Sequence, residues 1–357
     1  MFEISGVFSD NGKKVIGLDV GSSLIKLVEI GDSRQGYVLK KYDQIPIPRG
    51  VIEKGLLQDQ TILAEKIRTL FKSSKCHLKN VVAALSGSSV IVKKANFAQM
   101  DDEELRELLT DEAENYMPFD DVSEINFDFH IIGENDLNPN QMDVMIVAAK
   151  KDIIESYINA IEEAGRKVAV MDVDTFAMET AYVENYDFAD EDIIGLVNIG
   201  ASMTDINIVK GGESVFTRSF QLGGDSITEA LQKKLKVSFE EAEKVKIEGG
   251  EKKNISQKEI LGYTEPIFSE IERSIDYFSS TFMDPYIKQI LISGGCSKLP
   301  GMIDMLSERL HCEVERFDPF RNVVCNSKVF DEAYLEEIGP TATIGIGLAL
   351  RRIDDKD

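Results

Sequence analysis

The sequence predicts an α/β fold in which two related mixed-sheet domains face each other across a cleft. The first observation is a repeat: Ile16–Ser23 and Gly195–Ser202 each have the pattern of an apolar strand that runs into a turn of small residues. Three residues of the first copy are separated from their counterparts in the second by the same number of positions: Asp19 from Asn198, Gly21 from Gly200, and Ser23 from Ser202. The second observation is that each copy continues into a further strand, Leu24–Ile30 and Met203–Val209. One such hairpin in each half of the chain indicates two domains of similar design.

The composition limits the classes of partner. A chain of 357 residues is long enough for two or more domains, and its net charge of −23 argues against nucleic acid and against direct adsorption to anionic membranes. No stretch approaches the roughly 20 apolar residues of a membrane span, and the first residues lack the pattern of a signal peptide. The cysteines and histidines have no metal-ligand spacing, so we expect reduced thiols in the cytoplasm and no histidine-based metal site.

The first half begins with the strands of a mixed sheet. Gly36–Lys40 continues the first hairpin as a third strand, and Val81–Leu85 has the short apolar run of a buried strand. Between them, Gln58–Ser73 places its apolar residues on one helical face. The chain is expected to return to this sheet through the strand Val168–Val170 and the helix Asp174–Val183.

The pattern between these segments predicts an inserted α/β subdomain, roughly residues 90–166. Asp101–Met117 reads as a helix with acids in its first turn, ended by Pro118. Two strands, Asn126–Ile132 and Asp143–Ala149, and a helix, Lys151–Ala164, are expected to follow. A stripe of aromatic residues is expected in the core of this subdomain rather than in a peptide groove: Tyr116, Phe119, Phe127 and Phe129.

The second half repeats the design and adds helices. The expected elements are the strand Val215–Phe220, the helix Ser226–Leu235, a helix from Ser238 to Lys246, a long helix from Ser256 through Phe278, the strand Gln289–Ser293 and the helix Thr341–Arg352. The predicted units are residues 1–89 with 167–190 and 340–357, residues 90–166, residues 191–225 with 270–339, and a small nucleotide-capping subdomain at 226–269.

The small-residue turns indicate phosphate binding, because Gly, Ser and Ala let backbone N–H groups approach a phosphate closely. In such a hairpin Asp19 would hold Mg²⁺ through its waters, and Lys26 could reach a terminal phosphate. The alternative for one hairpin is an ordinary turn that contains Asp, and the repeat favours the phosphate site.

Two further segments fit a nucleoside. Ser293–Ser297 follows a strand with a double glycine, which permits flat approach by a nucleoside. Glu243 and Lys246 could bracket the ribose and base, although at this spacing on a helix they could equally be a solvated ion pair.

The order of these motifs resembles the actin-like ATPase superfamily over nearly the whole chain. The position of the insert is similar to that in the cell-division protein FtsA. Glu112–Phe119, the segment from Lys150 to Gly165, Asp172–Ala177 and Phe216–Arg218 are more similar to the PilM family, which are cytoplasmic actin-like proteins of type IV pilus assembly. The resemblance implies an actin-like ATPase fold with an FtsA/PilM-type inserted subdomain, and ATP with Mg²⁺ in the cleft.

The motifs and the resemblance together predict the nucleotide-binding residues. These are Asp19, Gly21, Ser22, Ser23, Lys26, Asn198, Gly200, Ala201, Ser202, Thr204, Gly223, Gly224, Glu243, Lys246, Gly294, Gly295 and Ser297. Asp174 resembles the superfamily's water-positioning carboxylate. The second hairpin departs from the family pattern, because Asn198 stands where Asp is usual. Since Asn adds no charge beside Mg²⁺, we expect hydrolysis to be slow or absent.

The resemblance also implies partners. It predicts binding of the N-terminal cytoplasmic tail of PilN, a single-span inner-membrane protein, and contacts with other inner-membrane and motor proteins of the pilus. The protein would then lie at the inner membrane through a protein partner, without inserting into it, and self-association remains open. Two alternatives are an FtsA-like division filament, disfavoured because the chain's last residues have no apolar face, and a metabolic kinase, disfavoured by Asn198 and the lack of a glycine-rich sugar site.

Overall fold

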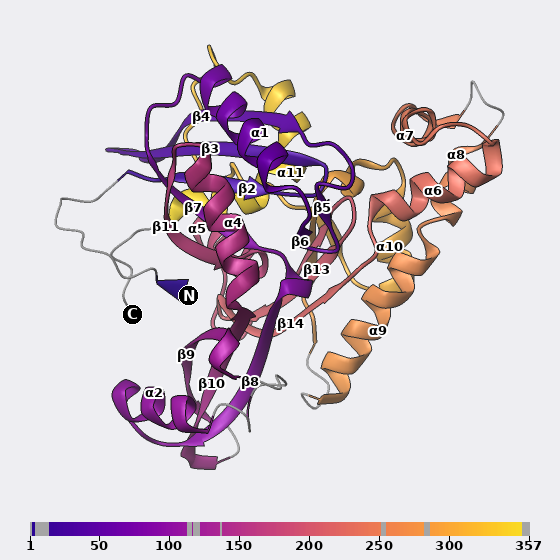
Figure 1. The fold of residues 1–357 in the computed structure, drawn as a ribbon. Coiled ribbons are helices and arrows are strands. Elements are labelled where there is room, and N and C mark those ends of the chain that lie inside the picture. The colour runs from indigo at the N-terminus through magenta and orange to yellow at the C-terminus, as the bar shows by residue number, and fades with distance from the viewer. Residues whose placement is uncertain are drawn as a thin grey trace.

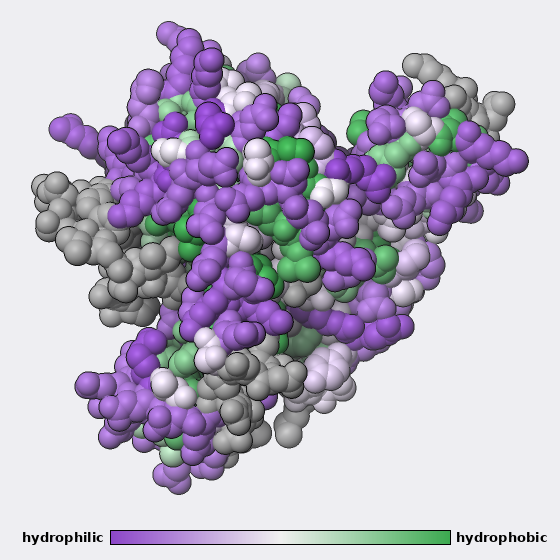
Figure 2. All heavy atoms as spheres, viewed as in Figure 1, coloured by the Kyte–Doolittle hydropathy of each residue, from purple (hydrophilic) through white to green (hydrophobic). Residues whose placement is uncertain are grey.

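The computed structural model describes residues 2–3, 14–112, 116, 122–135, 138–250, 255–281 and 286–351. Two mixed sheets lie on either side of a central pair of helices, and a third, smaller sheet extends from the first lobe (Figure 1). No described helix is both long and apolar enough to cross a bilayer. In Figure 2, hydrophilic residues cover most of the face shown, and hydrophobic residues gather where the lobes meet.

The first sheet has six strands. In spatial order they are β1 (Phe2–Glu3), β11 (Lys167–Val173), β7 (Asn80–Leu85), β2 (Ile16–Val20), β3 (Leu24–Ser33) and β4 (Gly36–Pro46). Helices α1 (Gln60–Ser73) and α4 (Lys151–Glu163) cover one face through a shared apolar core. Helix α1 begins where the Asp59 carboxylate accepts the N–H of Ile62, a side-chain cap that satisfies one of the unpaired donors of the first turn.

The second sheet repeats the topology of the first. Its spatial order is β14 (Glu213–Phe220), β13 (Thr204–Lys210), β12 (Ile193–Ile199), β15 (Gln289–Ser293) and β16 (Val314–Arg316). The antiparallel meander β12–β13–β14 corresponds to β2–β3–β4, and β15 runs parallel to β12 as β7 runs parallel to β2. The prediction of two related mixed-sheet domains is therefore confirmed.

The inserted segment forms a separate antiparallel sheet in the order β8 (Val90–Ala98), β10 (Asn138–Lys150), β9 (Ile125–Asn135). Helix α2 (Asp102–Asp111) packs Leu105 and Leu109 into its core. Strand β8 was not predicted. The rest of the helix expected from 101 to 117 falls largely outside the described residues, as does Phe119. The other aromatic residues of the stripe, Tyr116, Phe127 and Phe129, pack against this core as predicted.

The remaining helices lie around the second sheet. They are α6 (Gly224–Leu235), α7 (Phe239–Glu248), α8 (Gln257–Gly262), α9 (Glu265–Thr281) and α10 (Met302–Leu310). The single helix predicted from Ser256 through Phe278 is wrong, because the chain breaks it at Thr264. There the Thr264 hydroxyl donates to the Leu261 carbonyl at 2.6 Å, and the Thr264 carbonyl accepts the N–H of Ile267. A side chain that bonds its own backbone in this way competes with helix continuation.

Helices α5 (Asp174–Asn185) and α11 (Glu332–Leu350) are buried between the two sheets. Helix α11 begins at Glu332 rather than at the predicted Thr341. Asp331 caps it by accepting the N–H of Tyr334, and Pro340 lies inside the helix. Small residues on α11 and on its neighbours allow close packing. An added Cβ at Gly17 of β2 would lie 2.6 Å from the backbone nitrogen of Ala349 in α11, and one at Gly347 of α11 would overlap the carbonyl of Ala177 in α5.

Candidate functional site

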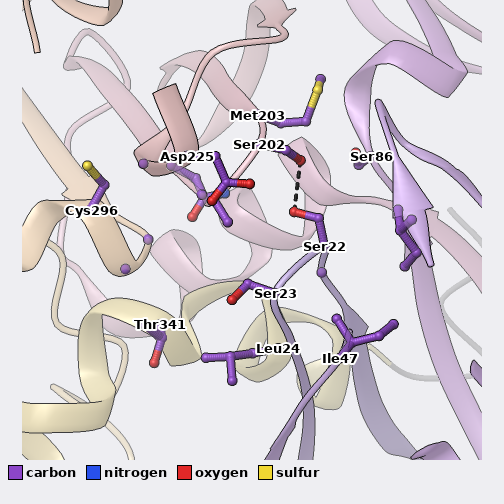
Figure 3. A pocket seen from close by; sticks show the side chains of 18 of the residues that line it. Ser22, Ser23, Leu24, Ile47, Ser86, Ser202, Met203, Asp225, Cys296 and Thr341 are labelled. Carbon is purple, nitrogen blue, oxygen red and sulfur yellow. Dashed lines mark hydrogen bonds between the residues drawn. The ribbon is translucent and has the colours of Figure 1, made fainter. Parts of the chain in front are cut away.

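A cavity of about 580 Å³ opens between the two hairpin turns. Its walls come from both hairpins, the loop after β15, the start of α5, and helices α6 and α7. Figure 3 shows the Ser22 and Ser202 side chains pointing toward each other and joined by a hydrogen bond, with Asp225 and Cys296 to one side and Thr341 of α11 below. The Ser202 hydroxyl donates to the Ser22 hydroxyl at 2.8 Å, so the two turns touch directly. The repeat in the sequence thus becomes a pair of opposed loops in one cavity.

The structure brings most of the predicted residues to this cavity. Its lining includes Asp19, Gly21, Ser22, Ser23, Lys26, Asp174, Asn198, Gly200, Ala201, Ser202, Gly224, Glu243, Lys246, Gly294 and Gly295. Thr204, Gly223 and Ser297 do not line it. The Thr204 hydroxyl donates to the Leu222 carbonyl and the Ser297 hydroxyl to the Gly294 carbonyl, both at 2.7 Å. Gly223 instead permits close packing, since an added Cβ would lie 2.6 Å from the Ala201 carbonyl oxygen.

The two turns have the same backbone geometry. The Gly21 N–H donates to the Leu24 carbonyl at 3.1 Å, and the Gly200 N–H donates to the Met203 carbonyl at 2.9 Å. An added Cβ at Gly21 would lie 3.1 Å from the Leu24 carbonyl oxygen, so the tight turn favours glycine. These turns hold short, small-residue backbone segments at the cavity wall, which is the arrangement that phosphate-binding loops require.

The charges of the two hairpins differ at equivalent positions. Asp19 and Lys26 are cross-strand neighbours on β2 and β3, and the Lys26 ammonium lies 2.7 Å from the Asp19 carboxylate. Asn198 and Asp205 occupy the same register on β12 and β13. The carboxylate missing at 198 therefore stands on the neighbouring strand at 205. Sequence reasoning missed Asp205, although Asp205 is the residue of the second hairpin that aligns with Lys26 of the first.

Carboxylates gather on the floor of the cavity. Burial raises the pKa of Asp174 well above its usual range, and the negative charges of Asp205 and Asp19 raise it further. Burial also raises the pKa of Asp205, although its hydrogen bonds, including one from the Ser219 hydroxyl at 2.6 Å, oppose that shift. A cation placed here would relieve the mutual repulsion.

The oxygen-bearing side chains of the cavity are better suited to binding Mg²⁺ through its waters than to chelating the ion directly. Within the described parts of the chain, no cluster of three or more His, Cys, Asp or Glu side chains is arranged to hold a metal. Asp19, Asp174, Asn198 and Asp205 nevertheless all line the cavity and offer oxygen atoms. Mg²⁺ keeps several waters and prefers oxygen ligands, so these side chains suit a hydrated ion.

The opposite end of the cavity holds a buried lysine network. The Lys246 ammonium pairs with Glu243 at 2.7 Å and donates to the Thr228 hydroxyl at 2.9 Å and to the Gly224 carbonyl at 3.1 Å. The ion pair expected as the alternative is therefore present, with Lys246 largely shielded from solvent and the Glu243 side chain 34% exposed. The network ties α7 to α6 and fixes Glu243 at the cavity wall.

Several residues that line the cavity belong to none of the sequence motifs. Arg49 lies in the loop after β4 and crosses the cleft, with its guanidinium 3.6 Å from the centre of the Phe239 ring and 3.1 Å from Glu229. Asp225, beside Lys246, has its pKa raised by burial, an effect that Lys246 opposes. Only the tertiary fold brings such residues to the cavity.

A buried polar network joins α5 to the second sheet behind the cavity. The Ser214 hydroxyl lies within hydrogen-bond distance of both the Glu179 carboxyl group and Asn207 Oδ1. The Asn207 amide donates to the Thr175 carbonyl at 2.9 Å. Burial raises the pKa of Glu179 to about 7, although Ser214 and Arg351 oppose the shift. The network connects the two lobes through a group that titrates near neutral pH.

We therefore expect Glu179 to make folding stability depend on pH. Its pKa in the folded protein is about 7, above the ordinary value of 4.5, so folding favours the neutral acid. That contribution is fully present below about pH 4.5 and is lost as the pH rises through about 7. In urea unfolding, the free energy of unfolding should fall more between pH 5 and pH 8 for the wild type than for Glu179→Gln. Equal losses would contradict the assignment.

Comparison with known proteins identifies the family. A family model described as type IV pilus assembly protein PilM matches residues 17–353. A chain of the solved PilM–PilN type IV pilus biogenesis complex is 28% identical, with a TM-score of 0.84 over 96% of this chain and 99% of that one. The cell division protein FtsA of Bacillus subtilis strain 168 is 20% identical over 359 residues, 87% of this chain and 80% of its own length.

Comparison with more distant structures supports the fold. MreB5 of Spiroplasma citri bound to ADP is 13% identical, with a TM-score of 0.52 over 91% of this chain and 98% of that one. The actin-like fold expected from the order of the motifs is thus confirmed. Because the family model covers nearly the whole chain, the protein belongs to the PilM family of type IV pilus assembly proteins.

Proposed function

We propose that this protein is a cytoplasmic ATP-binding scaffold of type IV pilus assembly that holds the N-terminal cytoplasmic tail of the inner-membrane protein PilN. The observation that carries the nucleotide part is the cavity between two hairpin turns of equal geometry. The relative MreB5 is described as bound to ADP in one structure and to AMPPNP in another, which supports a nucleotide in the equivalent cleft.

The residues of the cavity divide into two groups. The turns at Gly21–Ser23 and Gly200–Ser202 would hold phosphates through backbone N–H groups and hydroxyls, with Lys26 at the terminal phosphate. Asp19 and Asp205 would bind the waters of Mg²⁺, which neutralises phosphate charge when bound. At the far end, the Glu243 carboxylate is positioned to accept hydrogen bonds from ribose hydroxyls.

Slow hydrolysis follows from Asn198. We expect turnover well below the roughly 1–100 s⁻¹ of ordinary kinases. Asn198 adds no charge at the position where the family usually has Asp, and Asp205 presents its carboxylate from the neighbouring strand instead. Asn198→Asp should raise the ATPase rate about tenfold or more, which is less than the roughly 10²–10⁴-fold that a positioned acid–base group contributes, while affinity for Mg·ATP stays similar. The exposed Asn322→Asp is the matched control and should change neither quantity. Brisk wild-type turnover would refute the argument.

The partner part of the proposal rests on the PilM–PilN relative, whose chain covers 96% of this one at 28% identity. The scaffold would lie at the inner membrane through PilN and would connect it to other inner-membrane and motor proteins of the pilus. The test is isothermal titration of a synthetic N-terminal PilN peptide into the intact chain, with a scrambled peptide of the same composition as control. No binding, or equal binding of both peptides, would remove the PilN assignment.

The alternatives are less well supported. The division-protein alternative rests on relatives of about one-fifth identity, such as the FtsA protein described above at 20%. The kinase alternative needs a carboxylate base and a substrate pocket, and it is disfavoured by Asn198 and by the lack of a glycine-rich sugar site in the insert. A pull-down from membrane extract with and without ATP separates them: pilus proteins support the scaffold, and division proteins support the alternative.

A further inference from the structure

One side chain of the first lobe reaches across the rim of the nucleotide cavity. Arg49, in the loop after β4, lines the cavity, and its guanidinium contacts the Phe239 ring and the Glu229 carboxylate. Glu229 belongs to α6 and Phe239 is the first residue of α7, so both partners stand on the second lobe. In Figure 2 the surface is hollowed between the first lobe and the arm that α6 and α7 form in Figure 1. Since Arg49 and Glu229 are each about half exposed, their contact bridges the two lobes at the surface.

The loop that carries Arg49 is fixed beside the first hairpin turn. Residues 48–51 form a tight turn, in which the N–H of the last residue donates to the carbonyl of the first at 3.4 Å. Gly50 has a φ of +85°, a conformation that glycine adopts without strain, and it follows Arg49 directly. Just before this turn, the Ile47 N–H donates to the Ser23 carbonyl at 2.9 Å. The backbone of Arg49 is therefore tied to the first of the two turns that face each other in the cavity.

The helices that receive Arg49 are tied to the second hairpin turn. At the start of α6, the Gly224 N–H donates to the Gly200 carbonyl at 2.9 Å, and the Asp225 N–H donates to the Ala201 carbonyl at 2.7 Å. Lys246 holds α7 on α6 through its bonds to that same segment. Each end of the bridge is therefore anchored to one of the two turns. A movement that separates the turns would pull Arg49 away from its partners.

Charge and shape both favour this bridge. Burial raises the pKa of Asp225, and the charges of Lys246 and Arg49 oppose that shift, so Arg49 faces a second carboxylate besides Glu229. A planar guanidinium can stack on an aromatic ring while it pairs with a carboxylate, which the compact ammonium of lysine does less well. An exposed ion pair contributes little by itself, because water and salt screen it. The stacked Phe239 ring supplies the additional attraction.

We propose that Arg49, Phe239 and Glu229 form a clasp that holds the two lobes together over the nucleotide and sets the rate at which nucleotide enters and leaves. The inference rests on the proposed function, which places a nucleotide in the cavity. Because the clasp belongs entirely to the protein, it resists opening equally with and without nucleotide. A contribution that is equal in both states cancels from the affinity, since only a differential contribution shifts the equilibrium. It remains in the rates, as for other elements that must open before a ligand is released.

The test is stopped-flow measurement of the binding and displacement of a fluorescent ATP analogue in the presence of Mg²⁺. Arg49→Ala should raise both the association and the dissociation rate constants about threefold to tenfold, as expected for the loss of one cation–π contact and one exposed ion pair. The Kd should change less than either rate constant. The matched control is Arg34→Ala, an exposed arginine between β3 and β4 that does not line the cavity, and it should exchange nucleotide at the wild-type rate.

Variants of the partner residues test what the clasp is made of. Phe239→Leu removes the ring and should raise both rate constants. Combined with Arg49→Ala it should add nothing further, because both changes break one contact. Arg49→Lys keeps the charge but stacks less well, so its rates should lie between those of the wild type and Arg49→Ala. Rate increases that multiply in the double variant would mean that the two residues act separately, which contradicts the clasp.

A fluorescent reporter tests the contact without nucleotide. The chain contains no tryptophan, so Phe239→Trp places a single reporter at the ring position. The guanidinium should shield one face of the indole from acrylamide. Arg49→Ala in this background should therefore raise the quenching constant, while Arg34→Ala should leave it unchanged. Equal quenching with and without the Arg49 side chain would show that the contact does not form in solution and would overturn the clasp.

The outcomes separate the clasp from the function beneath it. If the wild type does not bind Mg·ATP, the nucleotide part of the proposed function fails and the clasp fails with it. If the wild type binds and Arg49→Ala exchanges nucleotide at the same rate, the function stands and the clasp is overturned. If Arg49→Ala raises the dissociation rate and the Kd together while association is unchanged or slower, Arg49 contacts the nucleotide itself, and the clasp is again overturned.

Discussion

Asp19→Asn is expected to remove most of the Mg²⁺-dependent stabilisation of this protein by ATP. A ligand at a hundredfold excess over its Kd stabilises the folded state by about 2.7 kcal/mol. Asp19 is 4% exposed and stands at the end of β2 beside the first turn, where its carboxylate is the charge best placed to hold the waters of the ion. The amide keeps the shape of the side chain and removes that charge.

The measurement is the melting temperature with ATP and Mg²⁺, with ATP and a chelator, and with Mg²⁺ alone. The matched control is Asp102→Asn, an exposed carboxylate at the start of α2. The control should retain the full shift. A full Mg²⁺-dependent shift in Asp19→Asn would show that Asp19 is not the metal-holding group, and no shift in the wild type would remove ATP from the proposal.

Gly347→Ala is expected to destabilise the whole fold, because it forces apart the two helices buried between the lobes. An added Cβ at Gly347 would overlap the Ala177 carbonyl and lie 2.6 Å from its carbon, and the backbone of α5 cannot rotate away as a side chain would. Overpacking of this kind costs about 1–3 kcal/mol, and more where backbone must move. Because α5 also carries Asp174, nucleotide affinity should fall with stability.

The control for this change is Gly262→Ala, at the end of α8. An added Cβ there meets nothing within 4 Å, and the backbone conformation is open to any residue. Urea unfolding should therefore show a lower midpoint for Gly347→Ala and little change for Gly262→Ala. Equal midpoints would mean that α5 and α11 separate more easily than their packing indicates.

Much of the candidate site could be predicted from the sequence, because its chemistry sits in local patterns. The turns at Gly21 and Gly200 are defined by a few neighbouring residues, and their equal spacing was enough to pair the domains. Lys26 and Asp19 are close in the chain and opposite in register, so their contact follows from the hairpin alone. The same reasoning applied to the second copy would have found Asp205 opposite Asn198.

Other features could not be found in this way. Thr204 and Ser297 carry hydroxyls in the right motifs, but each hydroxyl is taken up by a nearby carbonyl, which depends on side-chain rotation rather than on sequence pattern. The break at Thr264 and the early start of α11 at Glu332 depend on single capping bonds. Arg49 reaches the cavity only because the first lobe packs opposite α7.

The sequence by itself determined the two hairpins and most of the helices and strands, because periodicity and turn chemistry are local properties of the chain. The order of its motifs also resembled the PilM family, which the family model then matched. The tertiary structure alone decided which distant residues share a wall. It placed Gly87 against Ser219, and Ser219 against Asp205, joining segments far apart in the chain. Such contacts come from the packing of whole domains, which buries apolar surface with no regard to distance along the sequence. For that reason the complete wall of the candidate cavity becomes visible only in the folded protein.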